Sequence, residues 1–127
     1  MGREDANEHG PSVWDLVVFQ KAYQAALDVH RLAMSFPAHE RFELTSQIRR
    51  SSKGICANLA EGRGRQQASS AEFRRFVAIA LGSTDETLLW CRFARDLGYI
   101  STEQHQQLER TYGEIARMLN GLLSRLR

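Results

Sequence analysis

The sequence predicts an all-α fold, specifically an antiparallel up-and-down four-helix bundle. The 127 residues include only two prolines, so long stretches of the chain can be helical. Apolar side chains recur at i, i+3 and i+4 over four long segments, which is the helical period. The connections between these segments are short, and short connections place consecutive helices side by side and antiparallel. A chain of this length forms one domain with a real core, so we expect a disordered tail at 1–11 and one bundle domain at 12–127.

The first helix is predicted to run from about Ser12, which is a suitable N-cap, to Phe36, with Pro37 ending it. Its core-facing residues are expected to be Val18, Ala22, Ala25, Val29, Leu32 and Phe36. A second apolar stripe beside them contains Leu16, Phe19, Tyr23, Leu27 and Met34. This apolar surface is wider than one core needs, which favours a subunit interface. The alternative is a helix that lies centrally in its own bundle.

The second helix is predicted from about His39 to Ala60. Its core stripe consists of Leu44, Ile48, Ile55 and Leu59. Gly62 is expected to stop this helix, and the Gly-Arg-Gly-Arg segment at 62–65 to form a loop.

The third helix is predicted to start near Ser69 or Ser70 and to reach about Leu97, with Gly98 ending it. Its inner face is expected to contain Phe73, Phe76, Val77, Ala80, Thr84, Leu88, Cys91 and Ala94. Four apolar residues fall on a different side and are predicted to form an oligomer interface: Ile79, Trp90, Phe93 and Leu97.

The fourth helix is predicted to begin after Ser101, with Glu103 and Gln104 in its first turn. It has one apolar stripe, which contains Leu108, Tyr112, Ile115, Leu119, Leu122 and Leu126. This helix therefore needs to bury only one face.

The sequence lacks the patterns of catalytic and metal sites found in helical bundles. No histidine has a glutamate three residues before it, as di-iron bundles require, and the 62–65 segment lacks the Lys-Ser/Thr of a phosphate loop. Cys56 and Cys91 show no metal-ligand spacing and are expected to be reduced, buried thiols of a cytoplasmic protein. We therefore expect no enzymatic activity, no cofactor and no metal. The N-terminus has no apolar stretch of a signal peptide, and no apolar run is long enough for a membrane span.

Cationic residues are concentrated between positions 47 and 75. The whole chain carries a net charge of only +2, but the acidic residues in this interval are Glu61 and Glu72 alone. The cations are Arg49, Arg50, Lys53, Arg63, Arg65, Arg74 and Arg75. Arginine suits phosphate contacts better than lysine, although codon usage in a GC-rich genome also favours arginine. The distribution predicts a local basic patch.

Two roles are predicted for the polar residues of this region. We expect the cationic side chains to bind nucleic acid, namely Arg49, Lys53, Arg63, Arg65, Arg74 and Arg75; a solvated basic face is the alternative. We expect a structural hydrogen-bond network between helices or subunits from Gln47, Arg50, Asn58, Glu61, Ser83 and Glu86. No aromatic residues interleave the cations from Arg49 to Arg65 in sequence, which favours structured RNA or duplex over stacking of single-stranded bases.

A long motif gives the chain a family resemblance. FPAHERFELTSQIRRSSKGICANLAEG at 36–62, AEFRRFVAIALGSTDE at 71–86 and LGYI at 97–100 resemble the bacterial four-helix bundle family that includes proteins encoded in intervening sequences of 23S rRNA genes. The chain departs from the usual family pattern at Ser51, Gly54 and Leu59, where Ala, Ser and Ile are usual. The resemblance covers about 14–126 and implies a cytoplasmic bundle that assembles into a ring, expected to be a homopentamer. Accessory proteins of diversity-generating retroelements look like relatives; they are basic pentamers that bind nucleic acid and a reverse transcriptase.

Two functions therefore follow as hypotheses. The first is a non-enzymatic, ring-forming bundle that binds RNA or DNA through Arg-rich surfaces. The second is an oligomeric scaffold or adaptor with a protein partner and no nucleic-acid partner.

Overall fold

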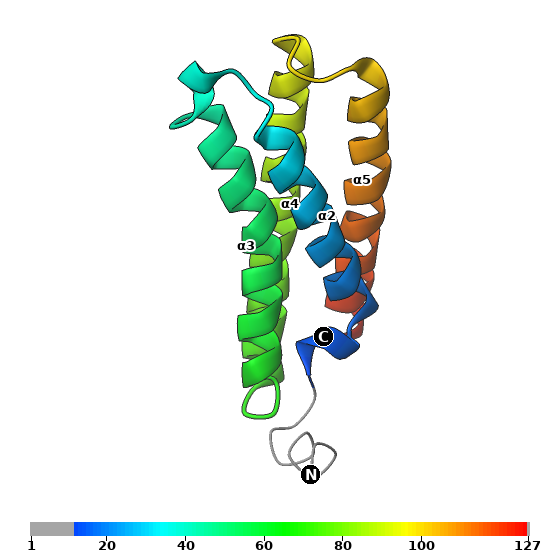
Figure 1. Cartoon of the computed structure of the whole chain (residues 1–127). Helices are drawn as coiled ribbons and strands as arrows, with labels where there is room; N and C mark the ends of the chain where they lie inside the picture. The colour runs from blue at the N-terminus through cyan, green and yellow to red at the C-terminus, as the bar shows by residue number, and fades with distance from the viewer. Residues whose placement is uncertain (1–11, 127) are drawn as a thin grey trace, which may run out of the picture.

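The structure, a computed structural model, describes residues 12–126, and the predicted tail at 1–11 lies outside the described residues. Four long helices form an antiparallel up-and-down bundle, as the sequence predicts (Figure 1). They are α2 (Val17–Ala33), α3 (Leu44–Arg65), α4 (Ser70–Asp96) and α5 (Thr102–Arg125). Two short 3₁₀ turns, η1 (Val13–Asp15) and η2 (Ala38–Glu40), precede α2 and α3.

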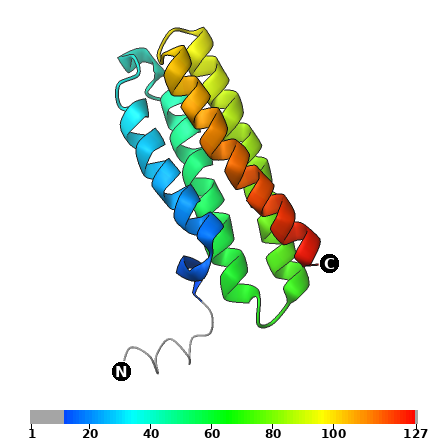
Figure 2. The ribbon, with the colours of Figure 1, turned by 90° about the vertical axis from the view of Figure 1, so that its right-hand side faces the viewer.

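The helices pack in chain order around one core. Each helix contacts the next, and α5 closes the bundle against α2. Figure 2 shows the bundle from the side of α5, with α2 next to it. The fully buried side chains come from all four helices and include Val29, Ile55, Phe73 and Tyr112. No helix of the described residues combines the length and apolar character that crossing a bilayer requires.

The first helix is shorter at both ends than the sequence predicts. Ser12 caps η1 instead of α2, because its hydroxyl accepts from the backbone N–H of Trp14, and extended Leu16 then interrupts the helix. At the other end α2 stops at Ala33, where the hydroxyl of Ser35 donates to the carbonyl of Leu32 at 2.6 Å. The predicted core stripe is nevertheless correct, since all its members are buried except half-buried Leu32.

The second helix is displaced toward the C-terminus relative to its prediction. It begins at Leu44 instead of near His39, because the carboxylate of Glu40 accepts from the backbone N–H of Leu44 and ends the preceding turn there. It also continues through Gly62 to Arg65, so the predicted stop at Gly62 and the predicted 62–65 loop are wrong.

Close packing against α4 explains why α3 continues through Gly62. A Cβ at this position would lie 2.7 Å from Cβ of Phe76 and 3.0 Å from Cδ1 of Phe73. Glycine is therefore needed here for helix contact and not for a left-handed turn. Of the described glycines only Gly98 has a positive φ, of 81°, and it does end its helix as predicted.

The third and fourth helices follow their predictions closely. The Ser69 hydroxyl accepts from the backbone N–H of Glu72 and starts α4. Ser101 and Gln104 form a reciprocal capping box at the start of α5. These boundaries depend on residues adjacent in sequence, and for that reason they can be read from it.

A buried carboxylate connects two turns at one end of the bundle. Glu40 is 8 % exposed, and its Oε2 accepts from the hydroxyl of Tyr99 in the α4–α5 turn at 2.7 Å. Hydrogen bonding by Tyr99 lowers the pKa of Glu40, and the carboxylate in turn raises the pKa of Tyr99. The η2 turn and the α4–α5 turn are thereby held together, at the end of the bundle opposite the α3–α4 turn (Figure 1).

Candidate nucleic-acid interface

A cationic groove lies over the turn before α3 and the first half of that helix. It is lined by Arg41, Phe42, Ser46, Arg49, Arg50 and Lys53. The last four of these residues are spaced at i, i+3, i+4 and i+7, so they share one face of α3. We call this set the start-of-α3 groove.

The start-of-α3 groove is lined by four cations and by no carboxylate. None of its four cations forms an ion pair with the described residues, and no acidic residue lines it. Nε of Arg49 is buried without a hydrogen-bond partner in this part of the chain. Cations without ion pairs can bind phosphate groups without first breaking a contact with a carboxylate.

The neighbouring histidine responds to this positive field. Nζ of Lys53 lies 3.0 Å from Nδ1 of His30 on α2, and the neutral ring accepts a hydrogen bond from the ammonium group. The charge of Lys53 lowers the pKa of His30, and partial burial, Arg49 and Arg31 lower it further. His30 therefore stays neutral near pH 7 and adds no charge to the groove.

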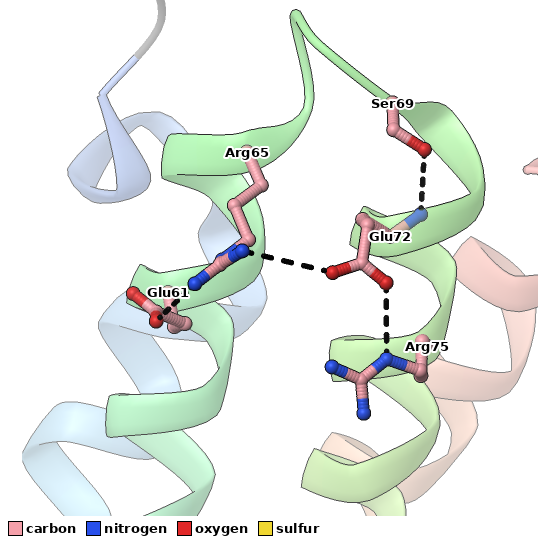
Figure 3. Close-up of polar contacts among 5 residues, drawn as sticks. All are labelled: Glu61, Arg65, Ser69, Glu72 and Arg75. Atoms are coloured by element: carbon pink, nitrogen blue, oxygen red, sulfur yellow. Dashed lines mark hydrogen bonds and ion pairs between the residues drawn. The ribbon is translucent and has the colours of Figure 1, made fainter.

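The other predicted nucleic-acid contacts lie at the far end of α3, around the α3–α4 turn. There Arg65 forms ion pairs with Glu61 at 3.0 Å and Glu72 at 3.7 Å, and Nε of Arg75 donates to Glu72 at 3.0 Å (Figure 3). The guanidinium groups of Arg65 and Arg75 also lie 5.5 and 4.7 Å from the ring centroid of Phe76.

Arg63 and Arg74 complete this second cluster. Arg63 donates to Gln66, and its guanidinium lies 5.9 Å from the ring centroid of Phe73. Arg74 is half-buried on α4. The six residues predicted to bind nucleic acid are therefore not one surface. Arg49 and Lys53 belong to the start-of-α3 groove, and the other four lie near the α3–α4 turn, where Arg65 joins α3 to α4 through Glu72.

The residues of the predicted polar network are not joined to one another by hydrogen bonds within residues 12–126. Nδ2 of Asn58 donates to the carbonyl of Gly54, Glu61 pairs with Arg65, and Glu86 accepts from Nε1 of Trp90, all within one helix. Gln47 and Arg50 are exposed. Ser83 lies against Gly54, where an added Cβ would meet its hydroxyl oxygen at 3.5 Å. A network between subunits stays a prediction.

Sequence reasoning missed two buried polar contacts between residues far apart in the chain. The hydroxyl of Thr87 on α4 donates to that of Ser51 on α3 at 2.9 Å, and both residues are buried. The second contact is the Glu40–Tyr99 hydrogen bond. Thr87 lies one turn after buried Thr84, and this spacing of small polar residues on a core face is the signal that could have revealed it.

An apolar groove adjoins the cationic one. It is lined by Glu40, Phe42, Glu43, Leu44, Gln47, Trp90, Phe93 and Leu97. Three of the four predicted interface residues are thus brought together, with Trp90 and Phe93 in ring contact at 5.7 Å. Ile79 is 40 % exposed and lies eleven residues before Trp90, which places it on the same face of α4 about 16 Å away along the axis.

The described residues offer no group of side chains placed to bind a metal ion. They contain no group of three or more His, Cys, Asp and Glu residues placed to hold a metal ion. Burial raises the pKa of Cys56 to about 11 and that of Cys91 to about 12, so both free thiols stay protonated near pH 7.

Comparison with known proteins agrees with this architecture. A family model described as 23S rRNA-intervening sequence protein matches residues 14–121. The chain belongs to this family. A crystal structure of a protein of unknown function from the S23 ribosomal protein family of Bacteroides thetaiotaomicron VPI-5482 is also similar. It has 28% sequence identity and a TM-score of 0.76 over 85% of this chain and 96% of that one.

No curated protein is significantly similar to the chain. Family membership thus supports the bundle fold and the resemblance noted from the sequence. The function has to be inferred from the chemistry of the surface, because a fold alone does not determine function.

Proposed function

We propose that this chain binds nucleic acid without catalysing a reaction, and that it does so through the start-of-α3 groove. The observation that carries the proposal is the set of four cations, Arg41, Arg49, Arg50 and Lys53, without an ion pair among the described residues. Phosphate contacts supply most sequence-independent affinity for nucleic acid, and arginine makes them in bidentate geometry. The family name links these proteins to 23S rRNA, so RNA is the first ligand to test.

The cations of the second cluster have a different role in this proposal. Arg65 and Arg75 are matched by Glu61 and Glu72, so binding a phosphate there would compete with existing ion pairs. These arginines stabilise the α3–α4 turn. The sequence predicts that these arginines bind nucleic acid, so the test compares a variant of this cluster with a variant of the groove.

The test compares two variants that lose the same charge. The variant R41Q/R49Q/R50Q/K53Q removes the four positive charges of the start-of-α3 groove. The variant R63Q/R65Q/R74Q/R75Q removes the four positive charges of the second cluster. Binding of a labelled RNA hairpin is followed by fluorescence anisotropy between about 50 and 200 mM salt. Four phosphate contacts predict a loss of affinity of about 100-fold over this range for the unmodified protein.

We expect the groove variant to lose most of its affinity and its salt dependence, and the second-cluster variant to retain both. Equal losses in the two variants would mean that net charge alone matters and would contradict the proposal. Loss of affinity in the second-cluster variant alone would show that the binding site lies at the α3–α4 turn.

A second function is supported by the apolar groove next to the cationic one. Phe93 and Leu97 are 47 % and 53 % exposed, and Trp90 and Leu44 line the same groove. We propose that this face assembles copies of the chain into a ring, and that the ring either displays the cationic grooves or acts as a protein scaffold. Capture of partners with and without nuclease treatment separates these two: partners that survive nuclease favour the scaffold.

A further inference from the structure

Phe42 is the most exposed large apolar side chain of the described residues. It is 85 % exposed, and it lies in the turn between η2 and α3. Nothing in the bundle core requires a phenyl ring there. A ring held out into solvent adds no buried apolar area to the fold, and its faces are accessible to a ligand or partner.

The ring stands among cations. Phe42 lines the start-of-α3 groove with Arg49, Arg50 and Lys53, and the guanidinium of Arg41 lies 5.3 Å from its centroid. In the sequence Phe42 lies several residues before Arg49, Arg50 and Lys53, so the sequence alone does not place an aromatic residue among them. The turn before α3 brings it beside them.

Cations and an exposed aromatic ring together match the two parts of a nucleotide. The cations from Arg49 to Lys53 span about one helical turn along α3, which allows them to follow a phosphate backbone. A flat apolar ring offers nothing to a phosphate, but it is a stacking surface for a base. In a duplex the faces of the bases are covered by their neighbours, so only an unpaired base can use such a ring.

On the basis of the proposed nucleic-acid binding, we infer that the start-of-α3 groove takes single-stranded nucleic acid. One base stacks on Phe42, and the flanking phosphates lie against Arg49, Arg50 and Lys53. The guanidinium of Arg41 lies over one face of the ring, which leaves the opposite face for the base. This assignment reverses the preference for structured RNA or duplex drawn from the sequence.

The competing occupant is a second copy of this chain. Phe42 also lines the apolar groove with Trp90 and Phe93, so oligomer formation through that groove could cover the ring. The experiment is designed to tell these occupants apart by using Phe93 as the matched control. It is an exposed phenylalanine that lines only the apolar groove.

The test measures the affinity of F42A, F42W and F93A for three probes by fluorescence anisotropy. The probes are an unstructured RNA of about 12 nucleotides, the DNA strand of the same sequence and the blunt duplex of that DNA. We expect F42A to weaken binding of both single strands by roughly 5- to 150-fold, which is the range for loss of one stacked base. Duplex binding should stay within about twofold, because it depends on phosphate contacts alone. F42W should restore single-strand affinity. F93A removes a side chain of the proposed subunit contact, so any loss of affinity that it causes should be equal for single strands and duplex.

Light scattering on each variant identifies the alternative. If F42A weakens binding of single strands and of duplex equally, or if its loss of affinity follows a fall in oligomer mass, Phe42 is a subunit contact and the inference is overturned.

The inference is also overturned if F42A binds single strands normally while R41Q/R49Q/R50Q/K53Q loses binding, and in that case the proposed function stands. If the quadruple variant binds as well as the unmodified protein, the proposed function itself fails. A preference for the RNA strand over the DNA strand would show that the 2′-hydroxyl is also contacted.

Discussion

Single residues determine how the ends of this bundle are closed. Glu40 is buried and ionised near pH 7, and it accepts hydrogen bonds from the Tyr99 hydroxyl and from the backbone N–H of Leu44. These bonds favour the carboxylate form and hold the pKa of Glu40 below its ordinary value of 4.5. The unfolded chain therefore binds more protons than the folded chain as the pH falls through this region, and folding loses the contribution of Glu40.

We expect E40Q to lower the melting temperature at pH 7 and to matter less in acid. The stabilisation from Glu40 is fully present above about pH 4.5 and is lost as the pH falls through its lower folded pKa. Thermal unfolding followed by circular dichroism from about pH 7 down to about pH 3 measures this convergence. E43Q is the control, because Glu43 is an exposed carboxylate in the neighbouring turn. Similar pH profiles for E40Q and E43Q would contradict the role given to Glu40.

At the scale of elements, α3 and α4 form a tightly packed hairpin. Gly62 lets the two helices approach where Phe73 and Phe76 cross it, and the buried Thr87–Ser51 hydrogen bond fixes the pair further along. The ion pairs of Arg65 and Glu72 then bridge the helices near the turn (Figure 3).

G62A should destabilise the protein by about 1–3 kcal/mol, because the new methyl group would overlap Phe76 in a packed contact. The control is G82A on α4, where an added Cβ meets nothing within 4 Å and alanine should stabilise the helix by up to about 1 kcal/mol. Urea unfolding of both variants gives the comparison. Stabilisation by G62A would mean that α3 does not pack closely against α4 at this point.

Element boundaries show which signals a sequence can carry. The start of α4, the start of α5 and the glycine after α4 depend on neighbouring residues, so they were predicted correctly. Glu40 accepts from the backbone N–H of Leu44 at the start of α3, and its carboxylate also accepts from Tyr99, which lies 59 residues away. The end of α3 depends on packing of Gly62 against α4. Such contacts exist only once the bundle has formed. A rule that treats glycine as a helix stop therefore failed at Gly62.

The candidate site was predicted in part for the same reason. Arg49 and Lys53 could be placed on one helical face by their spacing, and they do line the groove. Arg41 and Phe42 lie in a turn, where helical periodicity says nothing about direction. One of the ion pairs that occupy Arg65 involves Glu72 on another helix, so the sequence could not show that this arginine is paired.

At the scale of the whole molecule, exposed apolar side chains follow one side of α4. Phe93 and Leu97 line the apolar groove, and Ile79 lies on the same face toward the other end of the helix. One core is already complete within the chain, with buried residues from all four helices. This outer face is therefore available for contact between copies.

Light scattering should give a mass near five times the 14.5 kDa of one chain. L97E should lower that mass, because a carboxylate would be buried in the apolar groove when copies associate. L89E is the matched control: Leu89 and Leu97 are 50 % and 53 % exposed on the same helix, but Leu89 does not line the groove. A monomeric unmodified protein, or equal effects of the two substitutions, would contradict this interface.

Along α3, cations with ion pairs and cations without them lie at opposite ends of the helix. This separation also affects how the protein approaches a charged ligand. Arg49 and Arg65 are sixteen residues apart on the same helix, which corresponds to about 24 Å along its axis. The charge of Arg49 has no ion pair, whereas that of Arg65 is neutralised by Glu61 and Glu72. This distance exceeds the screening length of about 8 Å at physiological ionic strength. A polyanion would therefore exert a torque on the tumbling protein and turn the start of α3 toward itself before contact. Encounters would then begin in the correct orientation, and the association rate would fall as salt is added.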